Sequence, residues 1–306
     1  MSASPVPPAK GKKLGRRIFS WLLTAFAALI VLVALAVLNN NYSIHKRSRA
    51  EFSAQLDRAI ETSTQWIVET AYNYGNADLM YMVGDMAEMS RDSRLQKYVQ
   101  DYLVSNRVNQ PGRPVTQYYA RWANPALPVP IIPRSQAVYL NWPDRWSTYA
   151  SAPDKVDITA ADRADMFSPT KYNWGIRLHI QLFALDIYRR FNGPSPELNR
   201  AINPVAEGVA RDAYWDFRVS DSYYQRSAMI LGAGRPDLVR RRWIERMLDA
   251  QTPDGTWNYC WYRWCRGIVE FKLREPTDRG HSTIQAAWAL YMLKYRYSDW
   301  IAQNYH

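Results

Sequence analysis

His281 is the residue of this chain best suited to acid–base chemistry. It follows Asp278 by three residues and lies at the start of an apolar run that predicts a helix. A carboxylate at that spacing can orient an imidazole so that its second nitrogen acts as a general base. The alternative interpretation is ordinary capping of the helix by Asp278 or Thr277, with His281 in a structural hydrogen bond.

The two cysteines, Cys260 and Cys265, are separated by four residues in an aromatic segment. In an oxidising compartment they can close a short loop as a disulfide, whereas in the cytosol they would be free thiols. A metal site is disfavoured, because the chain has only four histidines and His45 and His306 lie toward its extremities. We expect a local disulfide, no metal and no cofactor, since glycine-rich phosphate loops and H-E-x-x-H pairs are also missing.

Basic residues at the N-terminus flank one apolar segment. Residues 1–50 hold eight Lys and Arg and no acidic residue, so the net charge of +11 falls to +3 over residues 51–306. A domain with so little charge lacks the basic footprint of a nucleic-acid-binding protein. The apolar segment 18–38, as a helix, matches the roughly 30 Å of a bilayer core. We therefore expect a single transmembrane helix, with a membrane and no nucleic acid as partner.

A cleaved signal peptide is the alternative for residues 18–38, because Ala34-Leu35-Ala36 has the small-x-small form. The apolar run exceeds a usual signal sequence and continues through that site, which favours an uncleaved anchor. Five Lys and Arg precede the run and three follow it, so the positive-inside bias favours a cytoplasmic N-terminus. We expect a basic disordered tail over 1–17, a single-pass anchor in the inner (plasma) membrane and an extracytoplasmic domain over 39–306.

The pattern of the remaining chain is helical. Apolar residues recur at three-to-four spacing over 50–74, 77–89, 93–105 and 176–191, and no segment sustains strand-like alternation. The predicted fold class is all-α. The stretch 106–170 holds nine of the eighteen prolines, which bar a long helix. We expect a long proline-rich loop there, either an ordered connection across one end of the helices or a lid or ligand wall.

One motif sharpens the fold prediction. Gln251-Thr252-Pro253-Asp254-Gly255-Thr256-Trp257 resembles the tail of the Q-x-x-x-G-x-W repeat of α/α-toroid proteins such as triterpene cyclases. In that superfamily the motif is structural and ties successive helical hairpins together. The resemblance covers residues 220–279. Within this range, the motif follows an amphipathic helix predicted over 236–250. It implies a full or partial ring of helical hairpins, but no cyclase chemistry, because the acidic catalytic run of the cyclases is missing.

In a toroid the N-terminal ends of the inner helices line one face of a central cavity, so the resemblance implies that several polar groups converge. His281, Asp278, Tyr224 and Arg226 are the expected catalytic residues, because a base with a nearby arginine can remove the proton beside a uronate carboxylate. Core packing of the aromatic residues and of the histidine at 179 is the alternative. The expected substrate-binding residues are Tyr172, Trp174, Arg177, His179, Asp221, Tyr223 and Arg279.

Two functions fit this pattern. An anchored lyase or hydrolase would act on an envelope or extracellular glycan, and a hydrolase would need two carboxylates about 5–9 Å apart. A non-catalytic envelope protein would instead use the aromatic cavity or the 106–170 loop to bind a glycan, a lipid or a partner protein. The enzyme requires His281 in a concave pocket, whereas the binding protein tolerates its loss.

The predicted topology makes Cys260 and Cys265 extracytoplasmic and oxidised. A membrane-impermeant thiol reagent should therefore label intact cells only after reduction, with lysed and denatured cells reporting the total thiols. Thiols that react without reduction, but only after lysis, would place the domain in the cytoplasm.

Overall fold

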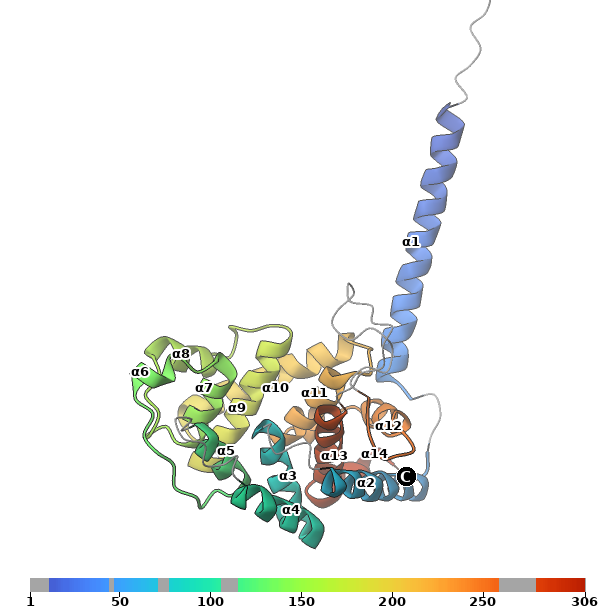
Figure 1. Ribbon diagram of the computed structural model, residues 1–306. Helices are drawn as coiled ribbons and strands as arrows, with labels where there is room; N and C mark the ends of the chain where they lie inside the picture. The colour runs from blue at the N-terminus through green and yellow to red at the C-terminus, as the bar shows by residue number, and fades with distance from the viewer. Residues whose placement is uncertain (1–10, 44–46, 71–76, 106–114, 259–278, 306) are drawn as a thin grey trace, which may run out of the picture.

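The computed structural model consists of a helical domain from which one long helix projects (Figure 1). It describes residues 11–43, 47–70, 77–105, 115–258 and 279–305. Within these ranges no strand forms, and the all-α prediction is confirmed. The helices are α1 (Gly11–Asn41), α2 (Arg49–Glu69), α3 (Ala77–Ser90), α4 (Ser93–Val104), α5 (Val115–Ala123), α6 (Arg134–Ala137), α7 (Trp142–Ser151), α8 (Ala160–Met166), α9 (Ile176–Asn192), α10 (Pro196–Trp215), α11 (Asp221–Gly232), the 3-10 turn η2 (Pro236–Leu238), α12 (Arg241–Asp249), α13 (Gly280–Tyr295) and α14 (Ser298–Asn304).

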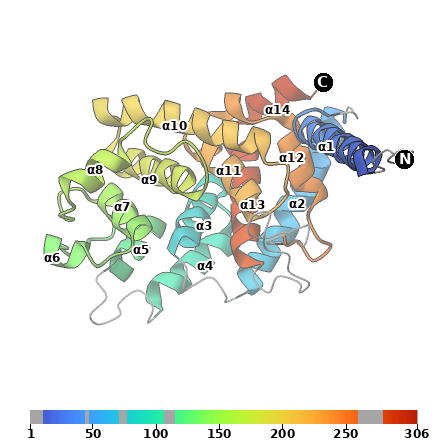
Figure 2. The same cartoon turned by 90° about the horizontal axis from the view of Figure 1, so that it is seen from above.

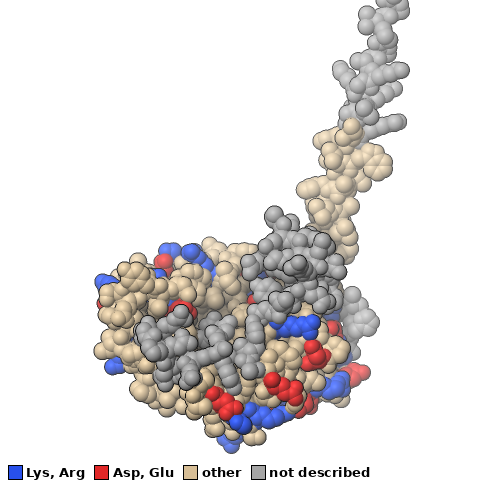
Figure 3. Space-filling model, in the orientation of Figure 1, with Lys and Arg blue, Asp and Glu red and all other residues tan. Residues whose placement is uncertain are grey.

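The long helix α1 contains the apolar segment. Ile18–Asn41 is long and apolar enough to cross a membrane, and its side chains up to Leu35 are exposed. Figure 3 shows no charged side chain on this part of the helix. The helix begins at Gly11, so the predicted disordered tail over 1–17 is helical in its second part. Lysine and arginine are good helix formers, which lets the helix extend into the basic residues.

The segment 106–170 differs from the predicted loop, because its described part carries the four short helices α5 to α8. The prolines among the described residues of this segment lie where a helix starts or where the chain connects two helices. Pro133 is the N-cap of α6, and Pro143 is in the first turn of α7, where Asn141 caps the amide of Asp144. A proline in the first turn loses no helical hydrogen bond, so proline content excludes long helices but not short ones.

Six helices contact one another in a closed order, α3 to α5, α7, α9, α11, α13 and back to α3. Figure 2 shows these helices grouped together, with α10, α12 and α14 toward the outside of the group. α4 packs on α3, α10 packs on α9 and α11, and α2 packs on α13. The chain therefore alternates between helices of the central group and helices that cover it.

The centre of this group is filled by side chains of α3, α9 and α13. Tyr81 meets the rings of Phe183 and Trp288 edge-on, with ring centroids 5.2 and 5.8 Å away. The Tyr81 hydroxyl donates to Asp186 at 3.0 Å, and the Trp288 indole donates to Asp85 at 2.7 Å. These four buried polar groups thus have partners, as a packed core requires.

The segment that resembles a toroid motif joins three helices. The Gln251 amide donates to a carbonyl of α2 at 3.0 Å, and the buried Trp257 indole donates to a carbonyl of α12 at 2.7 Å. The backbone N–H of Trp257 donates to Thr283 of α13. Gly255 has a φ of +83°, and a Cβ there would lie 2.4 Å from the carbonyl oxygen of Thr62. Only glycine allows this close approach of the turn to α2.

The last turn of α1 is bound to the end of α10 by two asparagines. Asn40 donates to the carbonyl of Ala213 at 3.0 Å, and Asn41 donates to the carbonyl of Tyr214 at 2.8 Å. The indole of Trp243 donates to the side-chain oxygen of Asn41 at 3.1 Å. Carbonyls in the last turn of a helix lack partners within the helix, so these buried amides supply them.

The chain after α1 continues along the polar face of α12. Arg242 donates to the carbonyl of Asn39 at 3.0 Å, and Ser43 hydrogen-bonds to Glu245. The amphipathic helix predicted over 236–250 is therefore present, as η2 followed by α12. Its charged side contacts Asn39 and Ser43, and its apolar side packs into the domain.

Replacing Asn41 by leucine should destabilise the junction between α1 and the domain. The substitution leaves the buried Trp243 indole without its partner and removes the shorter of the two bonds to the Tyr214 carbonyl, which costs about 2–3 kcal/mol. Thermal unfolding of the full chain in detergent should show a Tm lower by roughly 5 °C. Asn39→Leu is the matched control, because Asn39 is exposed, and its Tm should change little. Equal shifts for the two variants would contradict the role given to Asn41.

Candidate functional site

The N-terminal ends of α7, α9, α11 and α13 share one face of the domain. Arg177 in the first turn of α9 lies over the ring of Trp142, the first residue of α7, at 5.5 Å. Asp221 begins α11 and pairs with His281, the second residue of α13. α10 runs the opposite way, so its C-terminal end, which binds α1, belongs to the same face. We call this surface the α1 face.

A histidine–aspartate pair lies on the α1 face. Nδ1 of His281 is 2.6 Å from Oδ1 of Asp221, and Ser282 donates to the same oxygen at 3.0 Å. The amide nitrogen of Gln285 is 3.3 Å from Nε2 of His281. A carboxylate at Nδ1 and an amide donor at Nε2 fit the neutral tautomer whose proton is on Nδ1. The His281 side chain is 23% exposed, so the pair can exchange protons with a ligand.

The carboxylate beside His281 is thus Asp221, which the sequence suggested only as a substrate-binding residue. Sixty residues separate the two in the chain, and only the packing of α11 on α13 joins them. Asp278, the partner expected from the spacing, lies outside the described residues. Cys260 and Cys265 also lie outside them, so the disulfide stays a prediction.

His179 belongs to a second cluster, which is buried. Its Nε2 lies 2.6 Å from Oδ2 of Asp212, and Arg226 donates to the same oxygen at 3.0 Å. The other arm of Arg226 donates to Asp216 at 2.9 Å, and Arg218 donates to Asp216 at 2.6 Å. Two carboxylates therefore share two guanidinium groups inside the domain. The structure thus brings together the predicted site residues His179 and Arg226, but both side chains are buried.

The pKa values of this cluster follow from burial and pairing. Burial lowers the pKa of His179 and outweighs the nearby Asp212 carboxylate, so the ring is neutral in the folded protein. Burial alone would raise the pKa of Asp216, but the guanidinium groups of Arg218 and Arg226 hold it at about 2. A neutral imidazole beside ion-paired carboxylate and guanidinium groups is suited to holding α9, α10 and α11 together.

Aromatic and cationic side chains form another part of the α1 face. Arg177 lies over the rings of Trp142 and Tyr172, at 5.5 and 5.8 Å, and Trp146 packs on Tyr172. Trp174, two residues before α9, is 57% exposed. Exposed indole rings of this kind can stack on sugar faces or insert into a membrane interface.

The remaining predicted residues lie around the histidine pair in different settings. The Tyr223 hydroxyl donates to the carbonyl of Trp243 at 3.3 Å, and burial raises its pKa. Tyr224 is fully buried against the ring of Trp257. Arg279 forms an ion pair with Asp254 at 3.0 Å. These contacts tie the three residues to α12 and to the 251–257 turn.

Asp212 and Asp216 are the residues that sequence reasoning missed. They lie at the end of α10, a helix for which no prediction was made. Ser195 followed by Pro196 is a helix-start signal, and the structure shows Ser195 capping the amide of Leu198. Four-residue spacing would then have placed both aspartates on one side of the helix.

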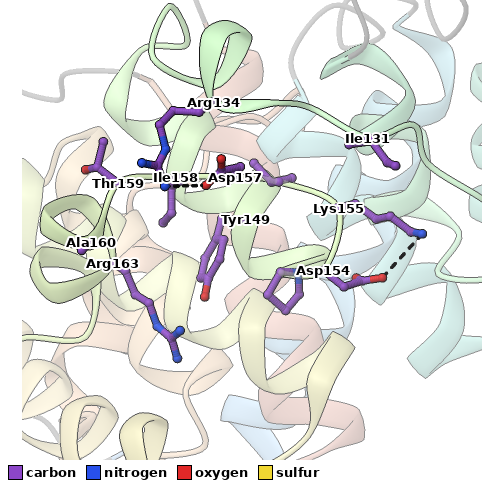
Figure 4. A pocket seen from close by; sticks show the side chains of 12 residues that line it. Ile131, Arg134, Tyr149, Asp154, Lys155, Asp157, Ile158, Thr159, Ala160 and Arg163 are labelled. Carbon is purple, nitrogen blue, oxygen red and sulfur yellow. Dashed lines mark hydrogen bonds and ion pairs between the residues drawn. The ribbon is translucent and has the colours of Figure 1, made fainter.

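A separate hollow of about 440 Å³ lies in the 106–170 segment (Figure 4). The Tyr149 hydroxyl points into it on the side of Arg163. Its charged groups are paired, Arg134 with Asp157 at 2.8 Å and Arg163 with Glu197 at 2.7 Å. None of the predicted site residues lines this hollow.

Comparisons with protein families, with curated proteins and with solved structures each find no match for this chain. Within the described ranges, no three His, Cys, Asp or Glu side chains are grouped as metal ligands would be. The function is therefore inferred from the geometry of the α1 face.

The buried state of His179 predicts a pH dependence of stability. Because its folded pKa is lowered, the unfolded chain takes up a proton that the folded chain does not, and stability falls as the pH drops below about 6.5. His179→Gln removes this contribution of up to about 1.4 kcal/mol per pH unit. Denaturant unfolding of both proteins at pH 7.5 and pH 5 should show a smaller difference at pH 5. A difference that grows on acidification would mean that His179 is protonated in the fold.

Proposed function

We propose that this protein is a single-pass membrane protein whose extracytoplasmic helical domain acts on an envelope or extracellular glycan. The apolar, exposed part of α1 and the basic residues before it support an uncleaved anchor with a cytoplasmic N-terminus. The closed order of helix contacts and the joining role of Gln251 and Trp257 support an α/α-toroid-like ring, packed at its centre.

The observation that carries the catalytic proposal is the contact between His281 and Asp221. The carboxylate orients the imidazole through Nδ1, and Nε2, which the Gln285 amide contacts at 3.3 Å, is the nitrogen that would act as a base once substrate displaces that amide. A base that removes the proton next to a uronate carboxylate starts a lyase reaction, in which the glycosidic oxygen leaves and a double bond forms in the sugar. Arg279, two residues before His281, is ion-paired with Asp254 at 3.0 Å and would have to exchange this partner to bind the uronate carboxylate.

A hydrolase fits less well, because the aspartates that the described residues bring together are buried and paired. Asp212 and Asp216 share Arg226, whereas Asp85 and Asp186 lie in the filled centre of the ring. Hydrolysis requires two carboxyl groups that both reach the glycosidic bond. We therefore favour the lyase over the hydrolase.

A non-catalytic binding role is the second candidate, and the hollow beside Tyr149 favours it. Its volume of about 440 Å³ suits one small ligand, and its wall carries paired cations and carboxylates together with the Tyr149 hydroxyl. In that case the 106–170 segment would be a ligand wall, and His281 would be dispensable.

His281→Gln should abolish the proposed activity without unfolding the domain. The full chain in detergent would be incubated with a panel of uronate-containing polysaccharides, and the unsaturated product followed by its ultraviolet absorbance. Loss of a general base should slow the reaction by roughly 10²–10⁴-fold. Asp221→Asn should also slow it, because the tautomer is no longer fixed.

Arg163→Gln is the control variant, since Arg163 lines the separate hollow and should leave turnover unchanged. An active His281→Gln protein would contradict the base assignment. New reducing ends without an unsaturated product would indicate a hydrolase. Ligand binding without turnover, lost in Arg163→Gln, would favour the binding role.

A further inference from the structure

The end of α1 is itself part of the junction with the domain. The helix runs without a break from the apolar segment to Asn41, where it is bound to α10 and α12 by buried hydrogen bonds. If α1 spans a membrane, as proposed above, the domain has a fixed orientation relative to the bilayer. Figure 1 shows α1 leaving the domain on the side of α8 and α10, with α4 on the opposite side.

The α1 face exposes large apolar side chains near both of its ends. Trp215 is 55% exposed and follows Tyr214, whose carbonyl binds Asn41, so it lies at the base of α1. Trp174 and Ile176, at the start of α9, are 57% and 53% exposed. Tryptophan with such exposure is typical of the membrane–water interface, where its ring meets lipid headgroups and acyl chains.

Cations accompany these apolar residues. Arg211 lies four residues before Trp215 on the same side of α10, Arg177 follows Ile176, and Arg240 lies over the ring of Tyr214 at 4.8 Å. Among the described residues, none of these three arginines forms an ion pair with a carboxylate. They are available for phosphate groups.

The opposite side of the domain has a different charge pattern. There, basic and acidic side chains alternate, as Figure 3 shows along the lower edge. Arg94 pairs with Glu61 and Lys97 pairs with Asp101. A neutralised surface of this kind has no preference for an anionic membrane. Arg177, Arg211 and Arg240 of the α1 face differ from these pairs, because among the described residues they have no carboxylate partner.

We propose that the α1 face rests on the surface of the bilayer that holds α1, with Trp174, Ile176 and Trp215 in the headgroup region and Arg177, Arg211 and Arg240 on anionic phospholipids. This inference rests on the proposed membrane anchor. It also narrows the substrate class, because His281 and Asp221 lie on the same face. The glycan that reaches them is one attached to a membrane lipid.

Photocrosslinking of the full chain tests this contact. The protein would be reconstituted in vesicles of phosphatidylcholine and phosphatidylglycerol that contain a phospholipid with a photoreactive headgroup, and crosslinked peptides mapped by mass spectrometry. We expect crosslinks on residues 172–177 and 211–218 but not on α4. Crosslinking to these two segments should fall several-fold in vesicles of phosphatidylcholine alone.

Residues 18–38 provide the internal standard when a second phospholipid carries the photoreactive group in its acyl chain. Arg177→Gln should weaken crosslinking of 172–177, whereas Lys97→Gln, which removes one charge from α4, should not. Crosslinks on 18–38 without crosslinks on 172–177 and 211–218 would overturn the inference and leave the anchor intact. No crosslinks on 18–38 would overturn the anchor and, with it, the bilayer contact.

Discussion

The structure depends on the hydrogen bonds that two buried asparagine side chains make with the end of α10. Asn40 and Asn41 occupy the position where the apolar helix meets the domain, and their amides bind carbonyls that α10 cannot satisfy itself. A buried amide that loses such partners is costly, so the junction has one geometry. That geometry fixes the direction of α1. It therefore also fixes which ends of α9, α11 and α13 lie on the side from which α1 leaves the domain.

Charge burial explains why only one acid–base pair is proposed as reactive. Asp212 and Asp216 are held ionised by Arg226, and burial keeps His179 neutral. Burial raises the pKa of Asp186 to about 6, although Arg189 opposes the change. Such groups hold neighbouring helices together, because a buried charge is tolerated when an opposite charge pairs with it. His281 and Asp221 are hydrogen-bonded to each other in the same way, but unlike the buried clusters their side chains are partly exposed to solvent.

Local sequence patterns predicted helices and turns, but they could not identify side-chain partners that lie far apart in the chain. The apolar spacing located α2, α3, α4 and α9 within a few residues, and the Gln251–Trp257 segment indicated a turn that joins helices. Sequence spacing suggested Asp278 as the partner of His281, because spacing relates only residues that are close in the chain. Asp221 is sixty residues away and is brought to His281 by the packing of α11 on α13. The proline-rich stretch 106–170 indicated a loop, because proline content does not show whether a proline starts a helix or lies in a connection. The site residues were thus named without their partners, and their roles stay proposals.

Electron cryo-microscopy of the full chain in lipid nanodiscs tests the rigid junction most directly. The account predicts that a single class of particles shows continuous helical density from the bilayer to α10 and α12. In that class, the N-terminal ends of α9, α11 and α13 face the lipid. Domains seen at many angles to the disc, or a fixed domain with α4 toward the lipid, would contradict it.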